Sequence, residues 1–322
     1  MTDYDVFNGD ADGICALHML RLEVPRESEL VTGVKRDIGL LKRVAAGAGD
    51  RVTVLDISLD KNRAALMRML DAGAEVTYFD HHQAGEIPRH VRLAAHIETG
   101  PEWCTSLLVD RYLSGRHRPW AVVGAFGDNL HAAARRAARD LALTEAQLDA
   151  LRELGECLNY NAYGETTDDL YFHPAALYRL LHAYRDPFEF IAAERAFVIL
   201  KEGCAQDLAR AQAVRPVHRC AAGAIYLLPN EAWARRVSGL FGNLLARQAP
   251  QEAHAVLTCK PGGYLVSIRA PLASPSGADG LASQFATGGG RKAAAGINHL
   301  PEGELERFFA AFDAAFTAGR AA

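Results

Sequence analysis

The sequence predicts an α/β protein, with a doubly wound parallel sheet in the N-terminal domain, a helical connector and a smaller α/β domain at the C-terminus. Over the first hundred residues, short β-rich runs alternate with helical patterns, and this alternation is typical of βαβ units in a parallel sheet. The chain has 322 residues, whereas a single hydrophobic core usually stops growing near about 250–300 residues. We therefore expect two domains.

Short strands and amphipathic helices are expected to alternate in the N-terminal sheet domain. The helical stretches carry apolar residues at three- and four-residue spacing, which is the period of one helix face. The expected strands are Asp5–Phe7, Leu30–Val34, Val52–Leu55, Val76–Phe79 and Val91–Ile97, and the expected helices are Gly13–Arg21, Ile38–Ala46 and Lys61–Ala72.

The pattern becomes helical from Leu107 to about Ala213, and Pro119 is placed to open one of these helices. Strand signals then return, and the run Lys260-Pro261-Gly262-Gly263 favours a hairpin turn between the last two strands. The expected strands are Ala224–Leu228, Ala255–Cys259 and Tyr264–Ile268, and the expected boundaries are 1–190 for the first domain, 191–213 for a helical linker and 214–322 for the second domain.

Composition and charge limit the class of partner. Charged residues make up 23% and hydrophobic residues 49% of the chain, which is ordinary for a globular protein. The formal net charge is -4, so no overall basic field exists to hold long duplex DNA through many phosphate contacts. A short or small anionic substrate is therefore expected, and a homodimer is compatible with the sequence.

The cysteines and the N-terminus indicate a cytoplasmic location. The six cysteines include no CxxC pair, so neither a zinc site nor a disulfide framework is indicated. The N-terminal residues MTDYDVFNGD lack the basic and apolar regions of a signal peptide, and no stretch approaches the roughly 20 apolar residues of a membrane span. We expect an intracellular protein that does not contact a membrane.

Acidic and imidazole side chains follow several of the expected strands. In a parallel sheet the carboxyl ends of the strands open onto one edge, so residues that are distant in sequence meet there. The residues at these positions are Asp10 and Asp12 after the first strand, Asp56 after the third, Asp80-His81-His82 after the fourth, and Asp128 after the apolar run 121–126.

Carboxylates packed together repel one another and lose hydration, so they must be protonated or neutralised by cations. Two divalent ions would balance the four charges of Asp10, Asp12, Asp56 and Asp128. Oxygen ligands with an imidazole suit Mn²⁺ or Mg²⁺, and two ions about 3.5–4 Å apart activate a water for attack on a phosphoester or phosphoanhydride. An aspartate after a strand is also a common helix N-cap, and Asp12 or Asp60 has this alternative interpretation.

The motifs together resemble those of DHH phosphoesterases, the family of RecJ exonucleases, nano-RNases, cyclic-dinucleotide phosphodiesterases and exopolyphosphatases. The resemblance rests on FNGDADG at residues 7–13, the strand end at Asp56, Asp80-His81-His82, and Gly127-Asp128. It implies two bound metal ions, Mn²⁺ first and Mg²⁺ or Co²⁺ as alternatives. The implied catalytic residues are Asp10, Asp12, Asp56, His81, His82 and Asp128.

The resemblance also implies how these residues divide. Asp10 and Asp56 would hold one ion. Asp12, His81 and Asp128 would hold the other ion, with Asp56 shared between both. His82 would face the substrate phosphate, and Asp80 would orient an imidazole by accepting its second N–H.

The first of these metal sites departs from the family pattern. Many members have a histidine where this chain has Val6, and RecJ-like members have an aspartate where it has Asn8. Asn8 is a further candidate ligand through its amide oxygen. We therefore expect a metal site with few strong ligands around Asp10 and a site with more ligands around Asp12, His81 and Asp128.

A glycine run near the C-terminus is a candidate phosphate-binding element. Glycines let backbone amides approach an anion closely, and an adjacent guanidinium binds phosphate through a planar fork. Gly288-Gly289-Gly290-Arg291 and the preceding strand with Arg269 resemble the DHHA1 domain of nano-RNases, although the family's motif usually ends in histidine where Arg291 stands. A flexible loop is the alternative. The implied substrate-binding residues are His82, Arg269, Gly288, Gly289, Gly290 and Arg291.

Two other segments have open interpretations. The run 159–164, NYNAYG, could line the cleft or form a buried contact between domains, and Arg135, Arg136 and Arg139 could steer anions or form a solvated helix face.

The leading hypothesis is a metal-dependent phosphodiesterase that acts on short oligonucleotides or on linear or cyclic dinucleotides. An exopolyphosphatase or phosphomonoesterase is the first alternative, because the same centre attacks anhydrides and esters. A nucleotide-binding sensor with weak or lost turnover is the second, because Val6 and Asn8 thin the first metal site.

Overall fold

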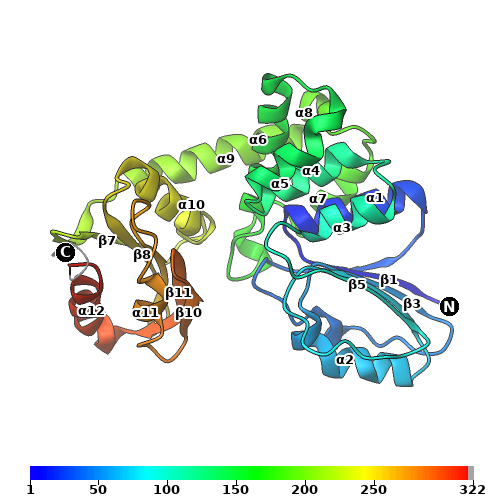
Figure 1. Cartoon of the computed structure of the whole chain (residues 1–322), viewed down its shortest axis with the longest axis horizontal. Coiled ribbons are helices and arrows are strands. Elements are labelled where there is room, and N and C mark those ends of the chain that lie inside the picture. The colour runs from blue at the N-terminus through cyan, green and yellow to red at the C-terminus, as the bar shows by residue number, and fades with distance from the viewer. Residues whose placement is uncertain (318–322) are drawn as a thin grey trace. The chain divides into compact units, whose positions relative to one another are not determined.

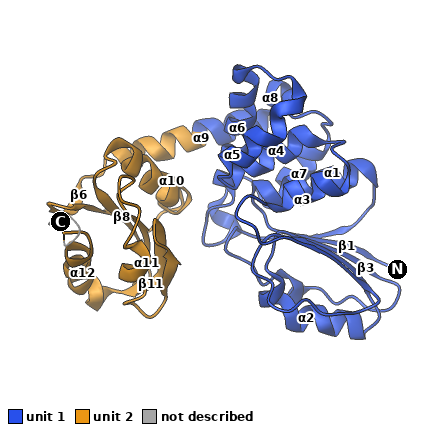
Figure 2. Ribbon diagram, viewed as in Figure 1, with its two compact units in different colours: residues 1–202 blue, residues 203–322 orange. Residues whose placement is uncertain are grey.

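The structure is a computed structural model that describes residues 1–317. The chain divides into two compact units, residues 1–202 and 203–322 (Figure 2). Helix α9, Arg195–Gln212, runs across the division and overlaps the expected helical linker. Within the described residues, no helix combines the length and the apolar character needed to cross a membrane.

The first unit is built on a sheet of parallel strands, as the sequence predicted. Its spatial order is β2-β1-β3-β4-β5, and every neighbouring pair is parallel. The chain leaves β1 toward β2 and then crosses to β3 on the other side of β1, so the winding reverses between β1 and β3. Open α/β sheets bind ligands at such a switch point. The strands are β1 Asp3–Phe7, β2 Glu29–Val31, β3 Arg51–Leu55, β4 Glu75–Asp80 and β5 Leu93–Ile97.

Helices cover both faces of this sheet (Figure 1). Helix α2, Leu59–Asp71, packs on one face together with the short 3-10 turn Leu40–Arg43. Helix α1, Ala11–Glu23, lies on the other face beneath a helical layer, and its residues 11–21 are all buried. This layer contains α3 Thr105–Tyr112, α4 Arg118–Gly127, α5 His131–Ala137, α6 Glu145–Asn161, α7 Pro174–His182 and α8 Pro187–Ala193.

The helix expected over Ile38–Ala46 is wrong, because only the 3-10 turn Leu40–Arg43 forms there. The side chain of Asn62 on α2 takes over the backbone hydrogen bonds that a helix would have made. Its amide donates to the carbonyl of Ile38 at 2.6 Å, and its oxygen accepts the N–H of Leu41 at 3.2 Å. The apolar spacing therefore marks a packed loop instead of a helix.

The second unit has a mixed sheet in the order β10-β11-β9-β8-β7-β6. The predicted hairpin is confirmed, since β8 and β9 pair antiparallel around the turn at 260–263, where Gly262 has a φ of 76°. Helix α10 packs on one face, and α11 and α12 on the other. The elements are β6 Pro216–Cys220, β7 Gly223–Leu228, α10 Ala232–Gln248, β8 Ala253–Lys260, β9 Gly263–Arg269, α11 Ala278–Ala282, β10 Gly288–Arg291, β11 Ala294–Pro301 and α12 Leu305–Thr317.

A pair of imidazoles lies between α1 and α7 in the core of the first unit. The Nδ1 atoms of His18 and His182 are 3.1 Å apart, so one ring donates and the other accepts. Burial lowers the pKa of His18 well below its ordinary value, and nearby His182 and His117 add to the effect. Burial also lowers the pKa of His182, with Arg21 contributing.

This pair predicts a loss of stability in mild acid. Below a pH of about 6.5 these two imidazoles bind protons in the unfolded chain but not in the folded chain, where their pKa is lowered. The free energy of unfolding should therefore fall as the pH decreases from about 7 to 5. Substituting His18→Gln should make the pH dependence shallower, as measured by urea unfolding at several pH values. The partly exposed His90→Gln is the control, and an equal change in slope for both variants would contradict the prediction.

Candidate metal centre

The carboxyl edge of the first sheet brings together side chains from three separate loops, as the sequence predicted. The Nε2 atom of His81, after β4, lies 3.4 Å from Oδ1 of Asp56, after β3. The same nitrogen lies 3.7 Å from Oδ2 of Asp128, the residue that caps the C-terminus of α4. These contacts place the centre beside the switch point of the sheet.

Asp56 is at the middle of the edge and is 2% exposed. Its φ of 61° is in the left-handed region, which a non-glycine residue adopts at a cost and which is common at functional sites. Its N–H bonds the carbonyl of Phe79, and the hydroxyl of Thr105 donates to Oδ1 at 3.0 Å. Burial raises the pKa of Asp56 well above its ordinary value, and the carboxylates of Asp10 and Asp12 raise it further.

Asp80 is fully buried and orients the two histidines that follow it. Its Oδ1 accepts the backbone N–H groups of His81 and His82 at 2.9 and 3.2 Å. It also lies 2.7 Å from Nδ1 of His82, so this nitrogen carries the proton and Nε2 keeps its lone pair. Burial favours the neutral imidazole, but the hydrogen bond and charge of Asp80 outweigh it and raise the pKa of His82.

Asp56, His81 and His82 have the geometry of a cation site. Each offers one donor atom, and the three atoms lie within 4.8 Å of one another. A carboxylate oxygen and two imidazole nitrogens are suitable ligands for a divalent transition metal. The residues present therefore fit one such ion, with Asp128 close enough to His81 to contribute a further oxygen.

Asp12 uses both carboxylate oxygens on the start of helix α3. Oδ2 accepts the N–H of Thr105 and Oδ1 accepts that of Ser106, each at 2.7 Å. These amides lack partners within their own helix, and the helix dipole favours a negative charge there. Asp12 thus binds the N-terminus of helix α3. Its role as a metal ligand stays a prediction.

Asp10, not Asp12, is the N-cap of α1, because its Oδ1 accepts the N–H of Gly13 at 3.0 Å. The N-cap of α2 is Ser58 and not Asp60. The second oxygen of Asp10 bonds a lysine that sequence reasoning missed. Burial raises the pKa of Asp10, but the charge and hydrogen bond of Lys35 outweigh it and hold that pKa below its ordinary value.

Lys35 follows strand β2 and reaches into the centre. Its Nζ lies 2.5 Å from Oδ2 of Asp10, 3.3 Å from Oδ1 of Asp128 and 3.1 Å from Oδ1 of Asn159. Burial lowers the pKa of Lys35, but the carboxylate of Asp10 raises it well above its ordinary value. The rule that placed the aspartates at this edge also applies to the end of β2, and it was the signal that could have found Lys35.

Asn8 and the segment 159–164 support this lysine. The side-chain amide of Asn8 donates to the carbonyl of Lys35 at 3.3 Å, and its oxygen accepts the N–H of Asp10 at 3.3 Å. The N–H of Lys35 donates to the carbonyl of Ala162 at 3.0 Å. The segment 159–164 therefore lines the centre, while metal binding by Asn8 stays a prediction.

The candidate phosphate-binding residues of the second unit lie in its sheet. Gly288–Arg291 form strand β10, paired antiparallel with β11, so the glycine run is not a flexible loop. Gly289 has open space where a side chain would start, and Arg291 is exposed. The guanidinium of Arg269 bonds Oδ1 of Asn243 at 2.6 Å and Oγ of Ser267 at 2.9 Å.

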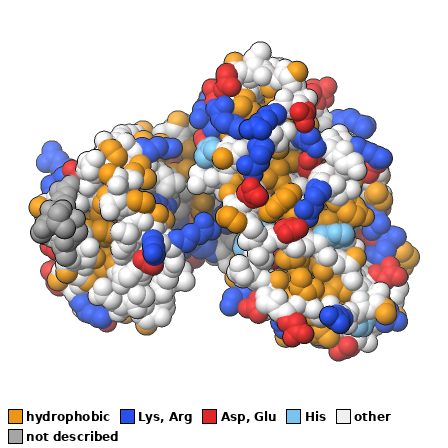
Figure 3. Space-filling view, in the orientation of Figure 1, with side chains coloured by type: hydrophobic (Ala, Val, Ile, Leu, Met, Phe, Trp, Pro, Cys, Tyr) orange, Lys and Arg blue, Asp and Glu red, His pale blue; other side chains and the backbone are white. Residues whose placement is uncertain are grey.

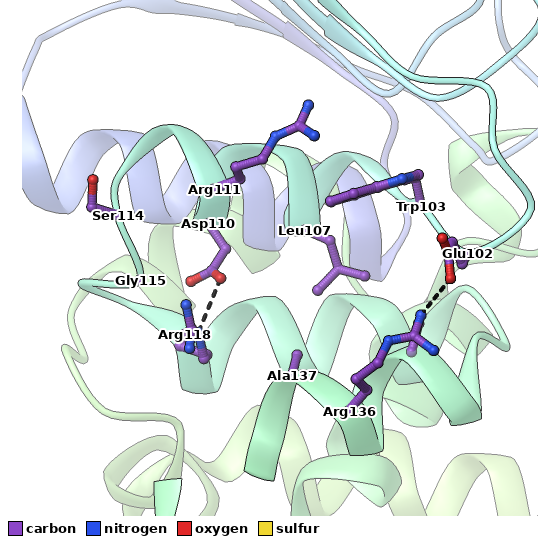
Figure 4. Close-up of a pocket in the computed structure, with 11 residues that line it drawn as sticks. Glu102, Trp103, Leu107, Asp110, Arg111, Ser114, Gly115, Arg118, Arg136 and Ala137 are labelled. Carbon is purple, nitrogen blue, oxygen red and sulfur yellow. Dashed lines mark hydrogen bonds and ion pairs between the residues drawn. The ribbon is translucent and has the colours of Figure 1, made fainter. Parts of the chain in front are cut away.

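A pocket of about 540 Å³ lies beside helix α3 (Figure 4). The guanidinium of Arg111 lies 4.5 Å from the ring centre of Trp103. The other two lining arginines form ion pairs, Arg118 with Asp110 and Arg136 with Glu102. Figure 3 likewise shows acidic side chains among the basic ones on the visible face of this unit. The charges of Arg118 and Arg136 at this pocket are therefore largely neutralised by neighbouring carboxylates.

Comparison with known proteins relates the chain to phosphoesterase structures. No protein-family model and no curated protein matches it. An exonuclease RecJ bound to manganese aligns with a TM-score of 0.62 at 18% identity, over 99% of this chain and 90% of that one. A pGpG-specific phosphodiesterase, PggH from Vibrio cholerae, aligns with a TM-score of 0.54 at 14% identity, over 98% and 99%. An exopolyphosphatase-related protein from Bacteroides fragilis gives 0.53 at 13%, over 98% and 92%.

The TM-scores of these alignments establish a shared fold. The expected likeness to DHH phosphoesterases is thus confirmed at the level of the fold, including the parallel sheet and the second sheet.

A close approach of α4 to the start of α3 provides a test of the centre's packing. A Cβ on Gly124 would lie 2.1 Å from Oγ of Ser106 and 3.3 Å from Oδ1 of Asp12. Substituting Gly124→Ala should therefore lower the free energy of unfolding by about 1–3 kcal/mol. The control is Gly280→Ala in α11, where a Cβ meets nothing within 4 Å. Denaturant unfolding measures both, and an unchanged Gly124→Ala would contradict the packing described.

Proposed function

We propose that the protein is a metal-dependent phosphodiesterase that hydrolyses short oligonucleotides or linear or cyclic dinucleotides. The observation that carries the proposal is the donor group Asp56, His81 and His82 at the switch point of the sheet. The manganese-bound exonuclease and the pGpG-specific phosphodiesterase with the same fold support phosphoester chemistry. The fold alone does not carry activity, so the site residues carry the argument.

Each residue of the proposed centre has a distinct task. A divalent ion, when bound, would polarise a phosphoryl oxygen and lower the pKa of a water. Asp56 and His81 would hold the ion, with Asp128 beside them. Asp80 fixes His82 in the tautomer whose Nε2 is free to accept a proton or bind a cation. We propose Mn²⁺ as the first choice of metal. The same set of oxygen and nitrogen ligands also admits Mg²⁺ or Co²⁺.

A small substrate fits the charges of the chain better than a long nucleic acid. The net charge is -4, and the arginines around the pocket beside α3 are paired with carboxylates. We propose that Arg269 and Arg291 bind a substrate phosphate. Asn243 and Ser267 hold the guanidinium of Arg269 in place, and the open space at Gly289 leaves the strand accessible beside Arg291.

Removing the central carboxylate should abolish hydrolysis. Asp56→Ala should lower kcat/KM by about 10³-fold or more, because metal-assisted activation contributes several kcal/mol. The measurement is product release with Mn²⁺ from a panel of dinucleotides, a short oligonucleotide, a nucleoside 3′,5′-bisphosphate and polyphosphate. Chelation followed by Mn²⁺ addition should remove and restore wild-type activity.

The matched control is Asp60→Ala, because this carboxylate is half exposed on helix α2. Near wild-type turnover by Asp56→Ala would refute the proposed centre. If only polyphosphate is turned over, the activity is that of an exopolyphosphatase and not of a phosphodiesterase. Binding of a dinucleotide without product would favour the sensor.

Phosphate binding by Arg291 should appear in KM. Arg291→Ala removes a charge-assisted contact of about 1.5–3 kcal/mol, so KM for a dinucleotide should rise by about 10-fold or more while kcat changes less. Arg219→Ala, an exposed arginine of the same unit that pairs with Glu252, is the control. Equal KM values for Arg291→Ala and wild type would exclude this role.

A further inference from the structure

Lys35 occupies the position where a second cation would be expected. Its ammonium contacts the carboxylates of Asp10 and Asp128 and the amide oxygen of Asn159. An ammonium has three hydrogen-bond donors, and these three oxygens match them. Lys35 therefore supplies a positive charge within the acidic edge itself.

The loop that carries Lys35 is fixed at several points. The backbone of Lys35 bonds the carbonyl of Ala162 and the side chain of Asn8. Gly9, next to Asp10, touches the same loop so closely that a Cβ would lie 2.1 Å from the carbonyl oxygen of Gly33. The lysine side chain is 25% exposed. Its position is therefore built into the fold and does not result from a surface side chain that swings freely.

The surroundings of Asp10 leave little to bind a divalent ion. One oxygen of Asp10 accepts the N–H of Gly13, and the other holds the ammonium. The oxygen of Asn8 already accepts the N–H of Asp10. Mg²⁺ requires near-ideal octahedral oxygens at about 2.0–2.1 Å, and the ammonium at 2.5 Å from Asp10 fills that space. These residues do not fit a second ion while Lys35 is present.

The two halves of the edge thus differ in kind. Asp56, His81 and His82 offer three donor atoms to one cation, whereas Asp10 is neutralised by the protein. We propose that the centre binds one divalent ion and that the Lys35 ammonium replaces the second. Lys35 is a positioning residue, since its contacts are with carboxylates and an amide. The inference rests on the proposed function only in taking the edge to be a metal site.

Counting bound ions tests this directly and without turnover. The metal-free full chain is titrated with Mn²⁺, the bound ions are counted by native mass spectrometry, and electron paramagnetic resonance distinguishes an isolated ion from a coupled pair. Wild type should bind one ion per chain and give the six-line spectrum of isolated Mn²⁺. Lys35→Met should bind two and give a coupled spectrum, while Lys35→Arg should still bind one.

Lys61→Met is the matched control, because this lysine is largely exposed on helix α2, and it should bind one ion. Two ions in wild type, or one ion in a folded Lys35→Met, would overturn the inference. If Lys35→Met fails to fold in a thermal unfolding assay, the wild-type count decides the matter alone. One ion without hydrolysis of any substrate would refute the proposed function and leave this inference intact.

Discussion

The structure of the first unit depends on how it tolerates several carboxylates at one edge of a sheet. Asp10, Asp12, Asp56 and Asp80 are each at most 2% exposed. Buried charges of the same sign repel, and they are stable only when hydrogen bonds or cations compensate them. The loops and helix ends around the edge supply this compensation.

Each carboxylate is compensated in a different way. Asp12 receives two amides from the start of α3, Asp80 receives three amides and an imidazole, and Asp10 receives the amide of Gly13 and the Lys35 ammonium. The carboxylate of Asp56 accepts the hydroxyl of Thr105, has His81 at 3.4 Å and has the carboxylate of Asp10 as a further neighbour. Burial raises the pKa of Asp56, and the charges of Asp10, Asp12 and Asp128 raise it further. Among these carboxylates, a bound cation would therefore stabilise the charge of Asp56 the most. The donor atoms around Asp56 also have the geometry to hold a cation.

The parallel sheet and the clustering of acidic residues at its edge could be predicted from the sequence, because both follow from local rules. Strand ends in a parallel sheet share one edge, so the proximity of Asp56 and His81 could be predicted from the sequence. The choice of partner could not be predicted in this way. Asp12 bonds amides that are 93 and 94 residues away in the chain, and the role of Lys35 depends on contacts 93 and 124 residues away. The lost helix at Ile38–Ala46 and the strand at Gly288–Arg291 likewise depend on partners outside the local pattern.

The central claim is that a cation binds beside Asp56 while Lys35 neutralises Asp10. Anomalous diffraction at the manganese edge, from crystals grown with Mn²⁺, tests it most directly. The account predicts a single anomalous peak with Asp56 and His81 as ligands and the Lys35 ammonium still on Asp10. Two peaks about 3.5–4 Å apart, with Lys35 displaced, or no peak at this edge, would contradict it.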